Sequence, residues 1–419
     1  MISRKLVPAE RMVDVFDRAS TLNFSIVAEL RGPLERTRIE AALRALERRH
    51  PLLRARLVRD GMRFEPGAPE IPLREAHGEV APEIAASCDH RAWSDDGPRA
   101  ELVWFPAANT LMLTLHHLVS DGSSGMLAMR DLLRLMAHDP RESVPSPGLN
   151  VLLPRAHGGL RDKLRTADMF ARAMFKKPHR LGDYRHPFEA RSARMHRLRL
   201  DAESSARLRA RSRRDGATVH GVLCGALALG VATQVPGAHL QRIVHPVDLR
   251  RYTRAASVGE AVGYYVSSVD SDHQLHRERS LPELAREISA TVGHKKRRGE
   301  PLLTAPLAGP LLTDRMANME SPRFRELAER NLLRNTFSLT NLGPLETLNV
   351  DHHYGELELV DLYFVAAGSV LSTLGAAAST YRDELSLLIG GVTPILTEAS
   401  VRELSEHAFA RLRDYASGK

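Results

Sequence analysis

The sequence is poor in cysteine and has no long apolar run, and each scarcity excludes a class of protein. Cys88 and Cys224 are the only thiols among 419 residues, too few for a disulfide framework or a cysteine-rich zinc cluster. Both are expected to be buried small hydrophobic groups. The longest apolar run, Gly221–Ala232, is shorter than the roughly 20 residues that cross a bilayer. No membrane span is therefore expected.

A targeting signal is also missing near the N-terminus. Pro8 and the charged pair Glu10–Arg11 follow only a few apolar residues, so the apolar core of a signal peptide does not form. We therefore expect a cytoplasmic protein. Aromatic residues are sparse, at 5%, but the hydrophobic share of 43% and the charged share of 26% are typical of soluble globular proteins. The length predicts two to three domains or one large fused unit.

Lysine is scarce as well, and arginine supplies nearly all of the positive charge behind the formal net charge of +8. The excess is local: residues 155–214 hold 15 Arg and 3 Lys against 6 Asp and Glu, a net of +12. Such a stripe is typical of contact with nucleic acid, an anionic membrane surface or a phosphate-bearing substrate. No zinc-finger, helix-turn-helix or RNP signature accompanies it, so nucleic acid is not an expected partner. A solvated crossover helix is an equally good interpretation.

Hydrophobic periodicity predicts an α+β chain with two lobes of similar size. The N-terminal lobe covers 1–155, a basic crossover covers 156–190, and the C-terminal lobe covers 191–419. Strands are expected at 21–31, 53–59, 62–64, 100–105, 110–117, 195–200, 242–247, 264–269, 336–340, 357–365 and 385–389. Helices are expected at 34–50, 123–137, 160–175, 202–214, 218–233, 281–295 and 400–415, and 218–233 is apolar nearly all round and so predicted to be buried.

The stretch most suggestive of chemistry is Leu111–Gly122, an alternating strand that ends in two adjacent histidines. Successive side chains of a strand point to opposite faces, so His116 and His117 cannot chelate one metal together, and no metal site is predicted. His117 shares the parity of the strand's leucines, which would carry it to the strand end beside Asp121 and the helix that follows. Ser123 is expected to cap that helix.

A histidine in this position suits general-base chemistry, because its unperturbed pKa of about 6.5 lies near the operating pH. The N-terminus of the following helix favours developing negative charge. Taken alone, however, a buried His-Asp pair is more often structural than catalytic. The rest of the motif decides between the two interpretations.

The string His-His-x-x-x-Asp-Gly, at 116–122, resembles the signature of the condensation-domain and CoA-dependent acyltransferase superfamily. Pro246–Arg250 is similar to that superfamily's second-lobe strand ending in Asp-x-Arg. Gly263–Tyr265 resembles the Gly-Asn-x strand that follows, with Tyr264 in place of Asn. Thr340–Pro344 resembles the Ser-Asn-x-x-Gly-Pro loop of wax-ester synthases, one residue shorter.

Among members of that superfamily, the chain most resembles polyketide-associated acyltransferases of the phthiocerol dimycocerosyltransferase type. Those are free-standing chains of about this length that begin with a short strand like Arg4–Leu6. The resemblance implies two chloramphenicol-acetyltransferase-like lobes that form a V-shaped pseudo-dimer, with the active site in a tunnel between them. It also implies that Tyr381–Pro394 reaches from one lobe toward the other.

The resemblance assigns roles residue by residue. His117 would be the general base that takes a proton from the acceptor. His116 would be structural, and Asp121 would hold Arg250 and so shape the His117 loop. The backbone N–H of Gly122 and the side chain of Asn341 would contact the oxyanion or the acceptor.

The implied reaction transfers an acyl group from a thioester to an alcohol or an amine, in polyketide, lipid or peptide biosynthesis. No cofactor is bound; the donor is acyl-CoA or a phosphopantetheinyl carrier protein, whose phosphates would meet Arg172, Lys176 and Lys177. The expected partner is an acyl carrier protein or a polyketide or peptide synthase, and the chain itself is expected to be a monomer. The alternative is a catalytically silent module that recruits a carrier protein.

Overall fold

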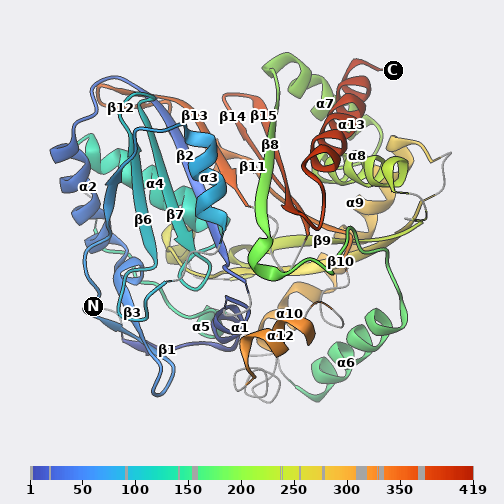
Figure 1. The fold of residues 1–419 in the computed structure, drawn as a ribbon, viewed down its shortest axis with the longest axis horizontal. Helices are drawn as coiled ribbons and strands as arrows, with labels where there is room; N and C mark the ends of the chain where they lie inside the picture. Colours follow the sequence, from blue (N-terminus) through green and yellow to red (C-terminus); the bar gives the residue numbers. More distant parts are fainter. Residues whose placement is uncertain are drawn as a thin grey trace.

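Two six-stranded sheets stand side by side and form two lobes (Figure 1). The computed structural model describes residues 3–418 except 18–19, 90–92, 140–141, 153–158, 236, 238, 254–255, 276–278, 308–318, 328, 330–334 and 367–372. The sheets are mixed with helices throughout, so the predicted α+β class and the two lobes are confirmed.

The sheet of the first lobe has the strand order β12-β13-β2-β7-β6-β5, and all of its pairs are antiparallel except β5 with β6. Its strands are β12 (His353–Tyr354), β13 (Leu357–Val365), β2 (Asn23–Arg31), β7 (Thr110–His116), β6 (Ala100–Phe105) and β5 (Leu73–Glu75). A small three-stranded sheet has the order β1-β4-β3 and consists of β1 (Arg4–Lys5), β4 (Arg63–Pro66) and β3 (Ala55–Val58).

Helices α2 (Arg36–Arg49) and α4 (Gly122–Met136) pack against each other and cover the first sheet, while α3 (Val80–Cys88) contacts both β2 and the second lobe. Every residue of β7 is buried. Both of its faces therefore lie inside the lobe, and parity alone does not separate a core face from a solvent face on this strand.

The sheet of the second lobe has the order β10-β9-β11-β14-β15-β8, with β11 parallel to both of its neighbours. Its strands are β10 (Val266–Gln274), β9 (Leu240–Asp248), β11 (Phe337–Pro344), β14 (Leu374–Tyr381), β15 (Glu384–Thr393) and β8 (Ser192–Leu200). The helices of this lobe are α7 (Ala202–Arg214), α8 (Val219–Gln234), α9 (Leu281–Arg297) and α13 (Glu398–Ser417). As predicted, α8 is buried, between α9, α13 and the sheet.

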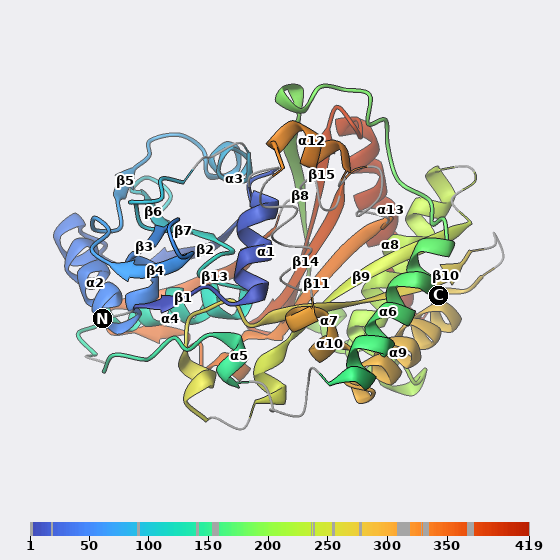
Figure 2. The same cartoon turned by 90° about the horizontal axis from the view of Figure 1, so that it is seen from below.

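Four further helices lie outside these layers: α1 (Pro8–Asp17), α5 (Leu149–Leu152), α10 (Glu300–Leu307) and α12 (Ser321–Leu327). The crossover helix α6 (Leu160–Phe175) contacts α10, beside the second lobe (Figure 2). Within the described part of the chain, no single helix is both long and apolar enough to cross a membrane; α7 and α8 meet that criterion only as a pair bent by 98°.

Two strands that come late in the chain lie in the first sheet and link the lobes. β13 pairs with β2, Tyr363 standing opposite Val27, and β12 pairs with β13. Tyr381–Pro394, expected to reach from one lobe toward the other, lies in the β14-β15 hairpin region of the second-lobe sheet, and its Tyr381 hydroxyl donates to the carbonyl of Leu359 on β13 at 2.9 Å. Periodicity marks 357–365 as a strand but carries no information on its partner. The boundaries at 155 and 191 stay predictions, although 353–365 lies with the first sheet.

Buried charges add a second link between the lobes. Arg130 on α4 contacts Asp131 and, 2.5 Å away, Glu260, which follows β9. Asp131 also accepts hydrogen bonds from Arg49 and His50. Arg130 and Asp131 are fully buried, and a buried charge is tolerated only where partners replace its water.

Candidate active site

His117 follows directly after the last residue of β7. Its backbone N–H donates to the carbonyl of Leu22, 3.0 Å away, which extends the pairing with β2 by one step. Its ring lies between two aromatic rings, with centroids 4.7 Å from Phe24 and 6.1 Å from Tyr264. The residue is half-buried, so its ring is fixed by packing and still open on one side.

The hydrogen bonds of His117 define its tautomer. Nδ1 lies 3.2 Å from the carbonyl oxygen of Ser120, and because a carbonyl only accepts, Nδ1 carries the proton. Nε2 therefore holds the lone pair, and it has no hydrogen-bond partner among the residues that the structure describes. Removal from water lowers the pKa of His117 to about 4, although the bond to Ser120 acts in the opposite direction. The ring is neutral at pH 7.

His116 points the other way and is buried. Its Nδ1 accepts from the N–H of Leu118 at 3.0 Å, and its Nε2 lies 2.8 Å from a carboxylate oxygen of Asp17 at the end of α1. The ring also meets Trp93 edge to face. Both ring nitrogens of His116 therefore face protein groups.

The carboxylate of Asp121 is the centre of the loop. It caps α4 by accepting from the N–H of Ser124 at 2.8 Å, and it accepts from the N–H of Tyr265 at 2.7 Å. Arg250 donates to both of its oxygens, at 3.1 and 3.2 Å. No hydrogen bond among the described residues joins Asp121 to His117, so the carboxylate holds the loop and reaches the imidazole only through its charge, which acts to raise the pKa of His117. The prediction that Ser123 caps this helix is wrong, because Asp121 is the residue whose side chain caps α4.

Arg250 closes the arrangement from the second lobe. Besides Asp121, its guanidinium donates to Ser124 Oγ at 2.5 Å and to the carbonyl of Ala261 at 3.0 Å, and it stacks over the ring of Tyr265 at 4.6 Å. Both charged side chains are nearly inaccessible, with 9% of Arg250 and 4% of Asp121 exposed. The structure thus brings together the two residues that the motifs paired, one from each lobe.

Gly122 lies in this loop, and Asn341 lies on β11 beside Leu342, which approaches Gly122. Gly122 is the first residue of α4, and its N–H has no hydrogen-bond partner among the described residues. A Cβ at this position would come within 3.2 Å of Leu342 and 3.4 Å of Phe364, so glycine permits the close approach of β11. Asn341 turns its Oδ1 to the N–H of Gly343, 2.9 Å away, which leaves its amide N–H₂ available.

The basic residues expected to bind the donor are not brought to His117. Lys176 and Lys177 follow α6 and are exposed, and Lys176 pairs with Asp272 of β10 at 3.0 Å. The side chain of Arg172 lies outside the described residues. Figures 1 and 2 both show α6 on the side of the second lobe away from β7.

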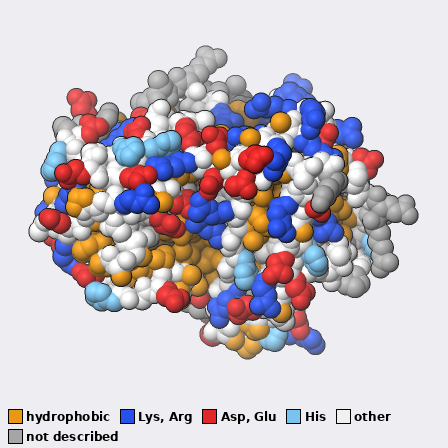
Figure 3. All heavy atoms as spheres, turned by 90° about the horizontal axis from the view of Figure 1, so that it is seen from above, with side chains coloured by type: hydrophobic (Ala, Val, Ile, Leu, Met, Phe, Trp, Pro, Cys, Tyr) orange, Lys and Arg blue, Asp and Glu red, His pale blue; other side chains and the backbone are white. Residues whose placement is uncertain are grey.

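Much of the remaining basic stripe is neutralised in space. Acidic partners from distant parts of the chain meet its arginines, in the pairs Arg191–Glu329, Arg194–Glu398, Arg197–Asp361, Arg199–Glu384 and Arg209–Asp383. Figure 3 shows the same mixture, with positive and negative side chains interspersed on the face seen there. A charge count along the sequence therefore overstates the local field.

Two features of the described structure were not foreseen, one at this site and one apart from it. The ring of Tyr264, which stands where the resembling motif has Asn, lies against one side of His117. That substitution was the one hint of this contact in the sequence. His220, Cys224 and His245 lie together in the second lobe. The spacing of four residues between His220 and Cys224 could have indicated that they share one face of a helix. The third residue, His245, comes from β9 and gives no such pattern in the sequence.

The contact between Asp121 and Arg250 gives a first prediction. Asp121→Asn should lower the free energy of unfolding by roughly 3–5 kcal/mol, because it leaves Arg250 buried without its charge partner. Arg250→Met should have a similar effect, and the double variant should lose less than the sum. The measurement is urea unfolding of all four proteins; strictly additive losses would contradict the coupling.

Residues 189–389 match the family model described as the phthiocerol/phthiodiolone dimycocerosyl transferase C-terminus. No curated protein matches the chain in sequence. Three solved structures match over nearly its whole length. Trichothecene 15-O-acetyltransferase TRI3 from Fusarium sporotrichioides has a TM-score of 0.75 at 15% identity, covering 99% of this chain and 95% of its own. Polyketide synthase associated protein 5 from Mycobacterium tuberculosis has 0.67 at 18%, covering 99% and 97%. The condensation domain of the Monacolin K polyketide synthase MokA has 0.71 at 15%, covering 100% and 98%.

At such identities the structural matches show the fold, which is the two-lobed, chloramphenicol-acetyltransferase-like fold that the motifs predicted. The tunnel between the lobes stays a prediction. Residues 189–389 thus resemble that transferase family in sequence, and the whole chain shares its fold with condensation domains and acetyltransferases.

Proposed function

We propose that the chain is an acyltransferase that moves an acyl group from a thioester, on CoA or on a carrier protein, to an alcohol or an amine. The observation that carries the proposal is the state of His117. Its ring is neutral, held by aromatic packing, and presents an Nε2 lone pair that no described residue occupies. A group in that state is a base with room for a proton.

In the proposed reaction, Nε2 of His117 takes the proton of the acceptor O–H or N–H while the acceptor attacks the thioester carbonyl. The tetrahedral intermediate then collapses, the C–S bond breaks, and the imidazolium returns its proton to the departing thiolate. Thiols have a pKa of about 8.5 and leave readily, so no covalent intermediate on the protein is needed. The low pKa of His117 keeps the imidazolium short-lived.

The charge on the carbonyl oxygen needs donors, and we propose Gly122 and Asn341 for this role. The N–H of Gly122 stands at the first position of α4, where the helix dipole also favours negative charge. Donors that are already oriented stabilise an oxyanion without reorganisation and commonly supply a large part of the rate. Support for Asn341 is its available amide and the contact of its neighbour Leu342 with Gly122.

The rigid setting of His117 supports the same reading. The bond to Ser120 fixes the ring rotation, and the loop that carries Ser120 is held by Asp121 and Arg250. Asp121 and His116 are positioning residues in this proposal, because neither faces the reacting atoms. A silent carrier-recruiting module is the alternative function, but it would not require a base with an open lone pair.

The donor and partner follow from the proposal. The names of two structural relatives, one a polyketide synthase associated protein and one a polyketide synthase domain, support a polyketide or peptide synthase or its acyl carrier protein as the partner. We propose that Arg172, Lys176 and Lys177 contact the donor's phosphates or an acidic carrier surface.

The base is tested with a panel of acyl-CoAs and acyl carriers offered with alcohols and amines, product being read by mass spectrometry. His117→Ala should lower kcat by about 10²–10⁴ while leaving the fold intact. His116→Ala is the matched control: it should lower Tm, because it removes the contact with Asp17, and keep more of the activity. An active His117→Ala beside a folded but inactive His116→Ala would reverse the assignment.

The pH dependence is the second test. With an alcohol acceptor, kcat/KM should stay level from pH 8 to about pH 5, since His117 keeps its lone pair until the pH approaches its pKa of about 4. Below that value the rate should fall as the ring gains a proton. Circular dichroism at each pH controls for unfolding. An acidic limb near pH 6.5, with the protein still folded, would contradict the assigned environment.

The basic segment gives a third test of the proposed function. Reversing Arg172, Lys176 and Lys177 to Glu should raise the donor's KM, and the wild-type KM should rise with salt, because the Debye length falls from about 10 Å at 0.1 M to about 3 Å at 1 M. Turnover at saturating donor should change little. Arg185→Glu, which alters another exposed charge of the segment, is the control. An unchanged KM in the triple variant would mean that the donor enters elsewhere.

A further inference from the structure

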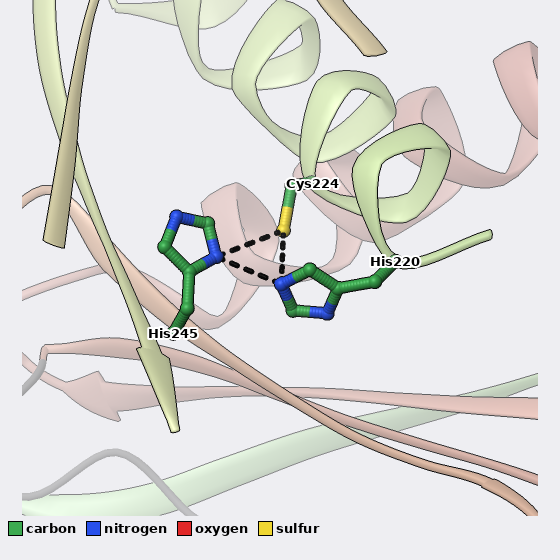
Figure 4. Close-up of side chains that lie close together, drawn as sticks. All are labelled: His220, Cys224 and His245. Carbon is green, nitrogen blue, oxygen red and sulfur yellow. Dashed lines mark hydrogen bonds between the residues drawn. The ribbon is translucent and has the colours of Figure 1, made fainter. Parts of the chain in front are cut away.

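A cluster of three metal-ligating side chains lies in the core of the second lobe, apart from the site of His117. His220 and Cys224 stand four residues apart on α8 and so share one face of that helix. His245 comes from β9, which runs beneath it. Figure 4 shows the two imidazoles and the thiol pointing toward one common space.

The distances suit a small ion. Cys224 Sγ lies 3.6 Å from His220 Nε2 and 3.8 Å from His245 Nδ1, and the two nitrogens are 2.8 Å apart. With ordinary Zn–N and Zn–S bonds, a tetrahedral zinc ion separates two nitrogens by about 3.3 Å and a nitrogen from a sulfur by about 3.6 Å. The two distances from the sulfur already suit zinc, and the distance between the two nitrogens needs to increase by only about 0.5 Å.

A chain of hydrogen bonds behind the cluster orients His245. His273 Nδ1 lies 2.6 Å from a carboxylate oxygen of Glu287, which only accepts, so His273 Nδ1 is the donor. His273 Nε2 then accepts from Ser271 Oγ at 2.7 Å, and Ser271 Oγ accepts from His245 Nε2 at 2.7 Å. The proton of His245 is thus on Nε2, and the lone pair of Nδ1 faces Cys224 and His220.

Metal-binding histidines are typically held in this way, with the remote N–H tied to a carboxylate or to a group that leads to one. We propose that His220, Cys224 and His245 bind one Zn²⁺ ion, through Nε2, Sγ and Nδ1. A carboxylate relay of this kind sets the one tautomer that His245 needs as a ligand. A purely apolar core position needs no such relay.

The charges around the cluster fit a thiolate ligand. Zinc binds cysteine as the thiolate, so the ion must displace the proton of Cys224 and releases one proton per ion bound. Lys295 and Lys296 of α9 add positive charge nearby, which the thiolate offsets.

A fourth ligand would come from solvent beside His220. That residue is half-buried, whereas Cys224 and His245 are buried. The protein ligands come from a helix and the strand below it. Bound zinc would therefore join α8 to β9 and raise the stability of the second lobe, independently of the proposed acyl transfer.

The test uses the full chain, freed of metal with a chelator and titrated with Co²⁺ and Zn²⁺. Co²⁺ should bind at one equivalent and give a thiolate-to-cobalt charge-transfer absorption, which Zn²⁺ then abolishes. Saturating Zn²⁺ should raise Tm by about 3 °C or more. Cys88→Ser is the matched control, since it removes the other thiol, and it should bind Co²⁺ like the wild type.

Cys224→Ser should lose the charge-transfer absorption and the Zn²⁺-dependent rise in Tm. Because that position is buried, His220→Gln serves as the second variant; its side chain is half-buried and should fold, with binding weakened at least tenfold. No charge-transfer band in the folded wild type, or an unchanged band in either variant, would show that the cluster is only a hydrogen-bonded part of the core.

Discussion

The buried carboxylate of Asp121 is the contact on which the arrangement of the two lobes at the candidate site depends. A carboxylate taken out of water is tolerated only where hydrogen bonds replace its hydration. Here the replacements come from the first turn of α4, from Arg250 after β9 and from the backbone of Tyr265 before β10. Satisfying one charge therefore fixes three segments from both lobes relative to one another.

The position of His117 follows from that constraint. The turn between β7 and α4 is short, so once Asp121 is held, Ser120 is held as well, and its carbonyl sets the tautomer of the imidazole. Tyr264 precedes the residue whose N–H bonds to Asp121, which places its ring against His117 from the second lobe. The lobes therefore meet at His117.

The sequence predicted local structure well where a pattern was strong. β7, α4 and α8 were found because their apolar residues repeat at the period of a strand or a helix, or fill a whole helix. β14 was not found, since its alanines, glycine and serine pack closely but have weak strand preference. The partner of β13 could not be found either, because pairing between distant strands is decided by the whole fold.

The same distinction applies to the sites. The Asp121 and Arg250 pair was predictable because each belongs to a motif with a known counterpart. Arg197 shows what linear reasoning misses, since it belongs to the basic stripe by sequence but contacts Asp361, 164 residues away, and stacks over Tyr363. The cluster of His220, Cys224 and His245 could not be predicted from the sequence either, because β9 lies beside α8 only in the folded lobe.

β9 contributes residues to the surroundings of His117 and to the cluster of His220, Cys224 and His245. The alternation of side chains along a strand explains how it reaches both. His245 and Val247 face one side, toward the helical layer, while Asp248 faces the other, where it accepts a hydrogen bond from Ser123 of the first lobe. Asp248 also accepts from the backbone of Arg250 at 2.9 Å. One strand thus carries His245 of the proposed zinc site on its inner face and, three residues later, begins the contact that holds the His117 loop. Because a paired strand is stiff along its length, the packing of α8 on β9 and the placement of Arg250 are set by the same element.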